Sequence, residues 1–248
     1  MLIVKEKERS SFLATPKVVF EDNHLLVLDK PAGWVVNVAK TTIGLQVLQS
    51  WLAQNYNYPL AKSRENRSGI VHRLDKETSG ILVVAKRKEA YDNLQKQFRE
   101  RVVEKTYIAL VHGKVSPEKG IIDAPVGRLP WRRDRFGVLP GGRSAKTSYK
   151  VIAYYLLDDA CYTLLELYPK TGRTHQIRIH MKYINHPVVG DAFYAGRKTA
   201  RKDRTWCPRL FLHANKLGFF HPFTFKKLTF ESKLTQDLQG VLGLFNVK

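Results

Sequence analysis

The sequence is poor in cysteine and in long apolar runs. Cys161 and Cys207 are its only cysteines and form no CxxC pair, so neither a disulfide framework nor a zinc knuckle is indicated. No apolar run approaches membrane-spanning length, and the N-terminal stretch has too few consecutive apolar residues for the core of a signal peptide. We therefore expect a soluble protein of the reducing cytoplasm, with no membrane partner.

Acidic residues are also scarce. Asp and Glu total 22 against 42 Lys and Arg, which gives a net charge of +20 and a pI of about 10.0. A solvated basic surface is the plainer explanation, but a folded chain with such an excess repels itself, and a bound polyanion relieves that repulsion. Nucleic acid is therefore the favoured partner.

Sequence signals for a metal or a nucleotide cofactor are missing as well. The chain has no glycine-rich nucleotide-binding loop. His175 and His180 suggest metal ligands, but five positions on a helix put them on different faces, and no acidic or cysteine partner lies close by in the sequence. We expect neither a metal nor a cofactor.

The most informative stretch is IVHRLDKETSGILVVAK, residues 70–86. Its two β-branched runs, 70–71 and 81–84, predict strands, and 76–80 predicts a turn between them. Asp75 lies where a rigid scaffold can present a carboxylate to a ligand. Taken alone, the stretch favours a plainer role, in which Asp75 caps the turn through its own backbone.

The remaining pattern predicts an α+β protein. Strands are predicted at 17–20, 25–28, 104–113, 147–155 and 162–168. Helices are predicted from Thr41 or Thr42 to about Asn55, around Tyr91, Leu94 and Phe98, and from His175, capped by Thr174, to before Asn185. Because strands and helices do not alternate regularly, we expect an α+β class with one domain over 17–248, preceded by a lead-in over 1–16.

Two basic segments are candidates for contact with RNA. Residues 128–150 contain Arg132, Arg133 and Arg135 with interleaved aromatics, a composition that suits backbone contact and stacking on irregular RNA. Residues 197–209 form a second basic patch. An exposed charged loop alone would have the same composition.

Three motifs together resemble the RluA family of pseudouridine synthases. They are HRLDKETSGILVVAK, EKTYIALVHGKV and PKTGRTHQIRIHM, in the family's order, and the similarity extends from about residue 18 to 230. The resemblance implies a mixed, largely antiparallel central sheet flanked by helices and loops, with the active cleft across the sheet. It begins almost at the N-terminus, which leaves no room for the small S4 RNA-binding domain of many relatives. We therefore expect the catalytic domain itself to hold the RNA.

The resemblance also implies roles for particular residues. Asp75 corresponds to the essential catalytic aspartate, Tyr107 to the tyrosine that stacks on the target uracil, and Arg178 to the arginine that pairs with that aspartate. Arg73 matches the arginine that fills the space left by the flipped nucleotide. Without the resemblance, Tyr107 is a core tyrosine and Arg178 a surface residue of a helix.

Two further positions are expected to contact the substrate. These are His72, beside Arg73 in the first motif, and Leu212, in the later fragment RLFLHANKLGFFHP that also resembles the family.

The implied activity is conversion of uridine to pseudouridine in RNA. Asp75 either attacks the sugar or assists proton removal from it, and the sequence does not separate these routes. Ribosomal RNA is the favoured substrate and transfer RNA the alternative. A catalytically silent RNA-binding or ribosome-assembly protein, or a hydrolase acting on nucleosides, would be the rival of another class. We expect a monomer.

Overall fold

The computed structural model describes residues 14–247, so most of the expected lead-in over 1–16 lies outside the described residues. The strands are β1 (Lys17–Glu21), β2 (Leu25–Lys30), β3 (Ser79–Ala85), β4 (Glu104–His112), β5 (Lys119–Asp123), β6 (Val126–Leu129), β7 (Arg132–Val138), β8 (Lys146–Leu157), β9 (Ala160–Pro169), β10 (Leu212–Phe220), β11 (Lys227–Glu231) and β12 (Asn246–Val247). The α-helices are α1 (Leu48–Asn55), α2 (Lys88–Glu100), α3 (Gln176–Tyr183), α4 (Arg197–Asp203) and α5 (Gln236–Leu242), and two 3₁₀ turns are η1 (Lys40–Thr42) and η2 (Arg67–Gly69).

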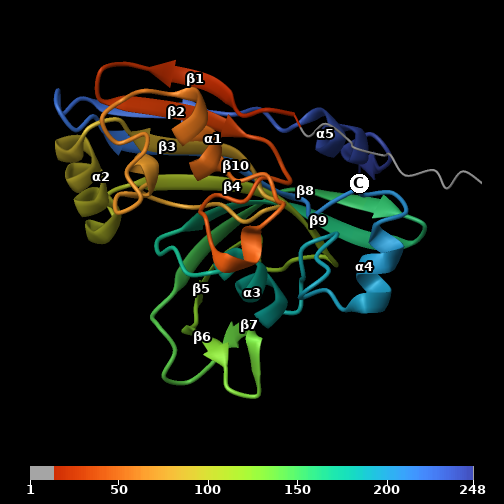
Figure 1. Cartoon of the computed structure of the whole chain (residues 1–248). Coiled ribbons are helices and arrows are strands. Elements are labelled where there is room, and N and C mark those ends of the chain that lie inside the picture. Colours follow the sequence, from red (N-terminus) through yellow and green to blue (C-terminus); the bar gives the residue numbers. More distant parts are fainter. Residues whose placement is uncertain (1–13, 248) are drawn as a thin grey trace, which may run out of the picture.

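Ten strands form one mixed sheet that runs through the whole molecule (Figure 1). The order along its main path is β1-β2-β3-β10-β4-β9-β8-β12, with β11 paired to β10 and β5 to β8. Within this sheet only the β3–β10 pair is parallel among the strands that the structure describes. The α+β class and the mixed, largely antiparallel sheet expected from the sequence are therefore confirmed.

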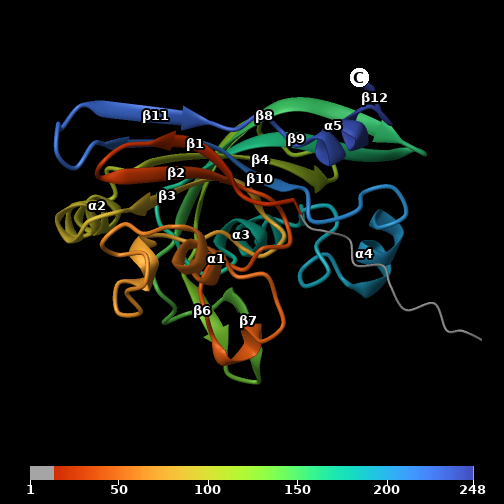
Figure 2. The ribbon, with the colours of Figure 1, turned by 45° about the horizontal axis from the view of Figure 1, so that its top comes forward.

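Alternation along β4 separates two hydrophobic clusters. Ala109 and Val111 face α3 and pack with Ile177, while Leu110 faces α5 and packs with Leu238. Successive side chains of a strand point to opposite faces of its sheet, so one strand anchors both helices. Figure 2 shows α1 and α3 together below the sheet, and Figure 1 shows α5 above its right-hand end.

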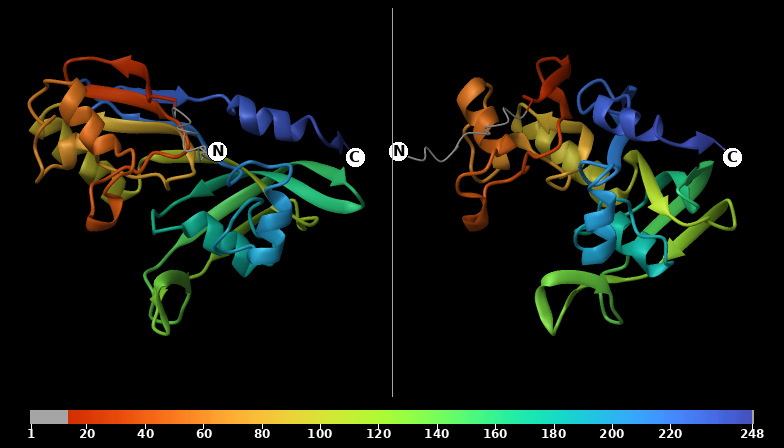
Figure 3. Two further views of the ribbon diagram at one scale, coloured as in Figure 1. Left: turned by 45° about the vertical axis from the view of Figure 1, so that its right-hand side comes forward. Right: turned by 90° about the vertical axis from the view of Figure 1, so that its right-hand side faces the viewer.

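The molecule has two halves, one around β4, β8 and β9 with α3 and α5, and one around β2 and β3. A separate hydrophobic cluster fills the second half, where α1 and α2 cover β2 and β3. β3 is buried along its whole length and Leu25 to Leu28 of β2 are fully buried, which explains their continuous apolar runs. The β6–β7 hairpin is not part of the main sheet and extends below α3 (Figures 1 and 3).

The two halves meet where β3 and β10 run parallel. Ser79 lies opposite His213, and Gly80 lies opposite Ala214. Gly80 has φ +116°, and a Cβ there would lie 2.1 Å from the Ala214 carbonyl oxygen. Only glycine allows this close approach without a backbone shift.

Three local predictions are wrong. Residues 70–71 do not form a strand, because Ile70 makes only an isolated bridge to Val84. The first helix begins at Leu48 and not at Thr41 or Thr42. The Thr42 hydroxyl instead bonds the backbone of Ala39 and closes a 3₁₀ turn, and Gly44 with φ +76° follows it.

The third helix begins at Gln176, and its N-cap residue is His175 in a left-handed conformation, where Thr174 was expected. Two short helices, α4 and α5, add to the three that the sequence pattern predicts. The predicted strands at 17–20, 25–28, 81–84, 104–113, 147–155 and 162–168 and the helix around Tyr91, Leu94 and Phe98 are confirmed.

Candidate active site

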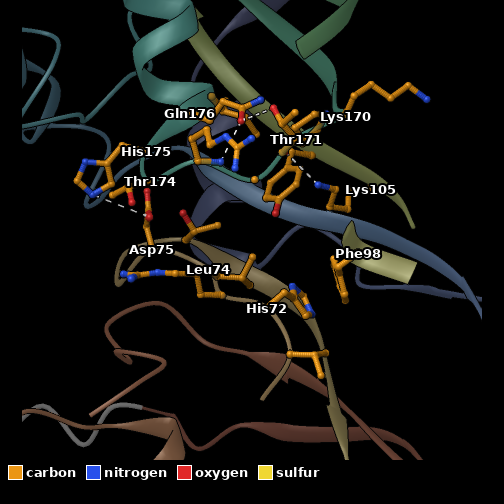
Figure 4. A pocket seen from close by; sticks show the side chains of 18 of the residues that line it. His72, Leu74, Asp75, Phe98, Lys105, Lys170, Thr171, Thr174, His175 and Gln176 are labelled. Atoms are coloured by element: carbon orange, nitrogen blue, oxygen red, sulfur yellow. Dashed lines mark hydrogen bonds and ion pairs between the residues drawn. The ribbon is translucent and has the colours of Figure 1, made fainter. Parts of the chain in front are cut away.

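A cavity of about 580 Å³ opens beside the β3–β10 junction. Its wall includes six of the residues that the sequence motifs singled out, namely His72, Arg73, Asp75, Tyr107, Arg178 and Leu212. Figure 4 shows Asp75 and His175 close together, with Lys105 and Phe98 at the other end of the cavity. The volume falls in the range typical of sites for small ligands, and an extruded nucleotide is of that size.

Asp75 lies in the loop that precedes β3, and this loop is held at several points. The fully buried Lys30 donates to the carbonyls of Pro31 and Trp34 and, at 3.3 Å, to that of Lys76. Burial lowers the pKa of Lys30 to about 7. Arg209 donates to the carbonyl of Glu77 at 3.1 Å. The residues after Asp75 are therefore fixed to both halves of the fold.

Arg178 joins two carboxylates. Its Nε and Nη2 bond both oxygens of the fully buried Asp191, at 2.7 and 2.8 Å, and its Nη1 donates to Oδ2 of Asp75 at 3.1 Å. The backbone N–H groups of Phe193 and Tyr194 also donate to Asp191. A bidentate pair fixes the plane of a guanidinium, so the third contact positions the carboxylate of Asp75. These two acids raise the pKa of Arg178 despite its burial.

His175 lies on the other side of Asp75. Its Nε2 is 3.9 Å from Oδ1 of Asp75, and its Nδ1 is 2.9 Å from the hydroxyl of Tyr194. A carboxylate can only accept, so the neutral ring is favoured with its proton on Nε2, facing Asp75, and Nδ1 then accepts from the phenol of Tyr194. Burial lowers the pKa of His175, so the ring is neutral at physiological pH.

Tyr107 extends from β4 into the same cavity and packs against the hydrophobic clusters of both halves. Burial, and then the charge of Asp75, raise the pKa of its phenol, which therefore stays protonated. A neutral, half-buried ring at this place offers a flat face for stacking.

His72 contributes to the wall of the cavity. Its Nε2 accepts the backbone N–H of Val83 at 3.0 Å, and its ring stacks on Phe98 with 4.7 Å between centroids. Burial lowers the pKa of His72 to about 3, so it carries no charge at neutral pH. Arg73, the next residue, is exposed and lines the opening.

Arg132 and Arg135 of the β6–β7 hairpin do not line this cavity. Arg132 is exposed and lies 3.8 Å from Asp134. Arg135 donates to the carbonyl of Phe193 and lies over its ring. Arg133 belongs to β7, but its side chain is outside what the structure describes. Contact of these three arginines with RNA stays a prediction.

Part of the second basic patch is structural. Arg209 was expected to face RNA, but it is 8% exposed and bonds the carboxylate of Asp237 from Nε at 2.6 Å. Arg204 pairs with Glu77 at 2.7 Å.

His213, beside Leu212, points away from the cavity: it is fully buried and bonds Ser79. Strand alternation explains why only Leu212 of these neighbours lines the cavity.

Several cations that line the cavity were not assigned to the site from the sequence, namely Arg67, Arg99, Arg101, Lys105, Lys170 and Arg173. Arg143 also lines it and belongs to the segment 128–150 that was expected to contact RNA. Asp75 is the only acid among the lining residues that the structure describes. The available signal was the position of Lys105, two residues before Tyr107 and therefore on the same face of β4. The arginines come from separate segments, and nothing in the sequence brings them together.

Two findings concern other kinds of site. Among residues 14–247, no three His, Cys, Asp or Glu side chains gather where they could hold a metal ion. No helix in that same range is long and apolar enough to cross a membrane.

Comparison with known proteins identifies the family. The family model described as "RNA pseudouridylate synthase" matches residues 24–183. The chain belongs to the RNA pseudouridylate synthase family. It is 41% identical over 230 residues to "Ribosomal large subunit pseudouridine synthase D" of Nitrosomonas europaea, which covers 91% of the chain and 64% of that relative. A relative of the same name from Pseudomonas aeruginosa is 39% identical, covering 92% of the chain and 71% of that protein.

Solved structures agree with this pseudouridylate synthase assignment. The structure titled "Human RNA Pseudouridylate Synthase Domain Containing 1" superposes with a TM-score of 0.72 at 26% identity, covering 94% of the chain and 89% of the human one. The chain spans 64% of the length of two of the curated relatives it matches, so what those whole proteins do is not carried over directly.

Proposed function

We propose that this protein isomerises specific uridines in structured RNA to pseudouridine. The observation that carries the proposal is the placement of Asp75, Tyr107 and Arg178 from three distant motifs in one cavity, with Asp75 held at 3.1 Å by Arg178. Membership of the RNA pseudouridylate synthase family gives this arrangement its chemical meaning.

Asp75 acts on the sugar of the target nucleotide. The N1–C1′ bond breaks, the uracil turns within the cavity, and C5 bonds to C1′. The proton that leaves C5 is balanced by the one that N1 gains, so no other reactant is consumed. Asp75 either attacks C1′ or removes a proton from the sugar, and Arg178 orients its carboxylate for both routes.

Tyr107 stacks on the extruded base, and Arg73 fills the place that the base leaves in the RNA helix. A uridine inside a helix cannot reach Asp75, so it is extruded at a cost of a few kcal/mol. Stacking on Tyr107 returns roughly 1–3 kcal/mol of this. Arg73 is exposed and lines the cavity, and in this proposal it occupies the vacated position, since a guanidinium can stack on bases while facing phosphates.

We favour ribosomal RNA of the large subunit as the substrate because four of the similar relatives name the large ribosomal subunit. Transfer RNA is the alternative target. In this proposal the protein works in the cytoplasm as a monomer. Light scattering after size exclusion checks the monomer directly.

The first experiment is pseudouridine mapping on total RNA from matched cells with and without this protein. Chemical labelling and reverse transcription should show one or a few sites lost without it, and their position in ribosomal or transfer RNA identifies the substrate. If no site changes although the protein is expressed and binds RNA, the silent RNA-binding alternative is favoured.

Asp75→Asn provides the matched test of mechanism. It keeps the shape of the side chain and removes its charge, so it should abolish pseudouridine formation while RNA affinity stays within a few-fold. Retention of full activity by this variant would show that the site is elsewhere. Release of free uracil from the RNA would indicate hydrolysis.

A further inference from the structure

The end of the cavity away from Asp75 holds cations without a matching acid. Lys105 of β4, Lys170 and Arg173 of the β9–α3 loop, Arg143 before β8 and Arg101 after α2 all line it. Four separate segments bring these five positive charges together. We call them the cation cluster.

The members of the cluster repel one another. The pKa of Lys105 is lowered to about 8 by burial and then by the charges of Lys170 and Arg173. That of Arg173 is lowered by burial and then by Arg143 and Arg101. Gathering like charges in a partly desolvated place destabilises the free protein, and an anion entering from solution removes that cost.

The backbone around the cluster is already organised. The side chain of Gln176 accepts from the hydroxyl of Thr171 at 2.7 Å and from the N–H of Arg173 at 3.0 Å, which closes the loop. The Nε of Arg173 donates to the carbonyl of Ser144 at 3.0 Å. Lys105 donates to the carbonyl of Thr171 at 3.1 Å, its one hydrogen bond within residues 14–247, and an ammonium carries three donors.

The position of Lys105 relates the cluster to the reacting base. Lys105 and Tyr107 are two residues apart on one strand and both line the cavity, so their side chains leave the same face roughly 7 Å apart. This is about the reach between a base and the backbone of its own or the next nucleotide. Figure 4 shows Lys105 directed toward Thr171 at the end of the cavity opposite Asp75.

We propose that the cation cluster is a binding site for the RNA phosphodiester next to the flipped uridine, with Lys105 and Arg173 as its principal ligands. The inference rests on the proposed function, since it assumes that the base stacks on Tyr107. The phosphate fixes the extruded nucleotide at its backbone while Tyr107 fixes its base. The two contacts together align C1′ with Asp75.

The test measures binding alone, with Asp75→Asn present in every chain. The probe is a fluorescently labelled hexamer of uridylate, and its affinity is measured over a range of salt concentrations. Lys105→Met and Arg173→Gln should each weaken binding about 5- to 10-fold at 0.1 M salt and lower the slope of log K against log salt by roughly 0.7, the value for one phosphate contact on a single strand. Lys105→Arg should keep the affinity.

Two controls separate a specific subsite from general charge attraction. Lys119→Met removes one exposed lysine on β5 that lines neither cavity, and should change neither affinity nor slope. A uridylate hexamer with uncharged methylphosphonate linkages should bind weakly and equally to the Lys105→Met chain and its parent. Melting temperatures no lower than that of the parent show that the variants fold.

Equal losses in Lys105→Met and Lys119→Met, or no loss in either, would overturn the subsite. So would the absence of any hexamer binding by the parent chain. Neither result decides the proposed function, because pseudouridine mapping in cells reports it separately.

Discussion

At the scale of single residues, the site depends on groups that hold Asp75 from both sides. Nη1 of Arg178 donates to Oδ2 of Asp75, and Nε2 of His175 lies 3.9 Å from Oδ1. That second distance is too long for a hydrogen bond, but such contacts commonly tighten when substrate closes the site. The hydroxyl of Tyr194 bonds Nδ1 of His175, and the ring of the hairpin residue Phe136 lies edge-on to the imidazole with 6.3 Å between centroids. His175 is thus a positioning residue for Asp75.

Tyr194→Phe tests this chain of contacts. Without the phenol, Nδ1 of His175 loses its donor, and Nε2–H no longer faces Asp75 in a fixed orientation. We expect kcat to fall about 10- to 100-fold with KM within a few-fold, because misplacement of a catalytic group acts on the chemical step. Steady-state pseudouridine formation over a range of concentrations of the mapped substrate measures both. His175→Leu should give a similar loss.

Tyr183→Phe is the matched control, since this exposed tyrosine at the end of α3 lies outside the cavity lining. A Tyr194→Phe enzyme with unchanged kcat, or one whose loss is entirely in KM, would contradict a positioning role.

At the scale of elements, the parallel pairing of β3 and β10 brings the two halves of the site together. Gly80 sits at this pairing with φ +116°, and an added Cβ would meet the backbone of Ala214. Gly80→Ala should therefore destabilise the fold by about 2–4 kcal/mol, through both a disfavoured backbone and a steric clash. Urea unfolding measures the loss.

Gly240→Ala is the control for Gly80→Ala, because Gly240 lies within α5 and a Cβ there meets nothing within 4 Å. Helix propensity predicts that it is neutral or stabilising by up to ~1 kcal/mol. Equal free energies of unfolding for the two variants would contradict the prediction, because they would mean that β3 and β10 can move apart at Gly80 without loss of stability.

The same elements show what the sequence can and cannot predict. Continuous apolar runs such as 25–28 and 81–84 predicted strands correctly, because burial on both faces leaves a local pattern. The start of α1 was wrong because Thr42 bonds the backbone locally instead of capping a helix. The Asp191–Arg178 pair joins α3 to the loop before α4, and single-sequence periodicity does not report such long-range contacts.

Some residues of the candidate site could be predicted from the sequence and others could not. Asp75, Tyr107 and Arg178 were found through motifs, and the structure brings them into one cavity. Of the cation cluster, only Arg143 lies in a segment, 128–150, that was expected to contact RNA. The other members were missed because they come from separate segments whose approach depends on the sheet order. The arginines 132, 133 and 135 were chosen for local density of charge, and local density does not indicate which residues line a cavity.

At the scale of the whole molecule, part of the net charge of +20 lies in the cavity, where repulsion between like charges destabilises the fold most because water is partly excluded. The lining of the cavity has nine Lys and Arg against Asp75. Repulsion between these cations lowers the free energy of unfolding of the free protein, and a bound polyanion raises it again. The stability of the free protein should therefore depend on the charge of Lys105.

The sign of the pH dependence follows from the pKa of Lys105. Its value is about 8 in the folded chain, lowered from 10.5, so between these values the unfolded chain binds more protons. Stability from this group therefore rises as pH increases from about 8 toward 10.5, and the full penalty is present below 8. Burial and the neighbours Lys170 and Arg173 are the causes.

Lys105→Met removes this penalty. We expect the variant to exceed the parent in free energy of unfolding by roughly 1–3 kcal/mol at pH 7, less whatever is lost with the hydrogen bond to Thr171. The advantage should shrink between pH 8 and 9.5, a window below the titration of the tyrosines. Urea unfolding of both chains at several pH values measures it, with Lys119→Met, which removes an exposed lysine, as the control. A difference that stays constant from pH 7 to 9.5 would show that Lys105 bears no penalty, and the cation cluster would then need no anion to balance it.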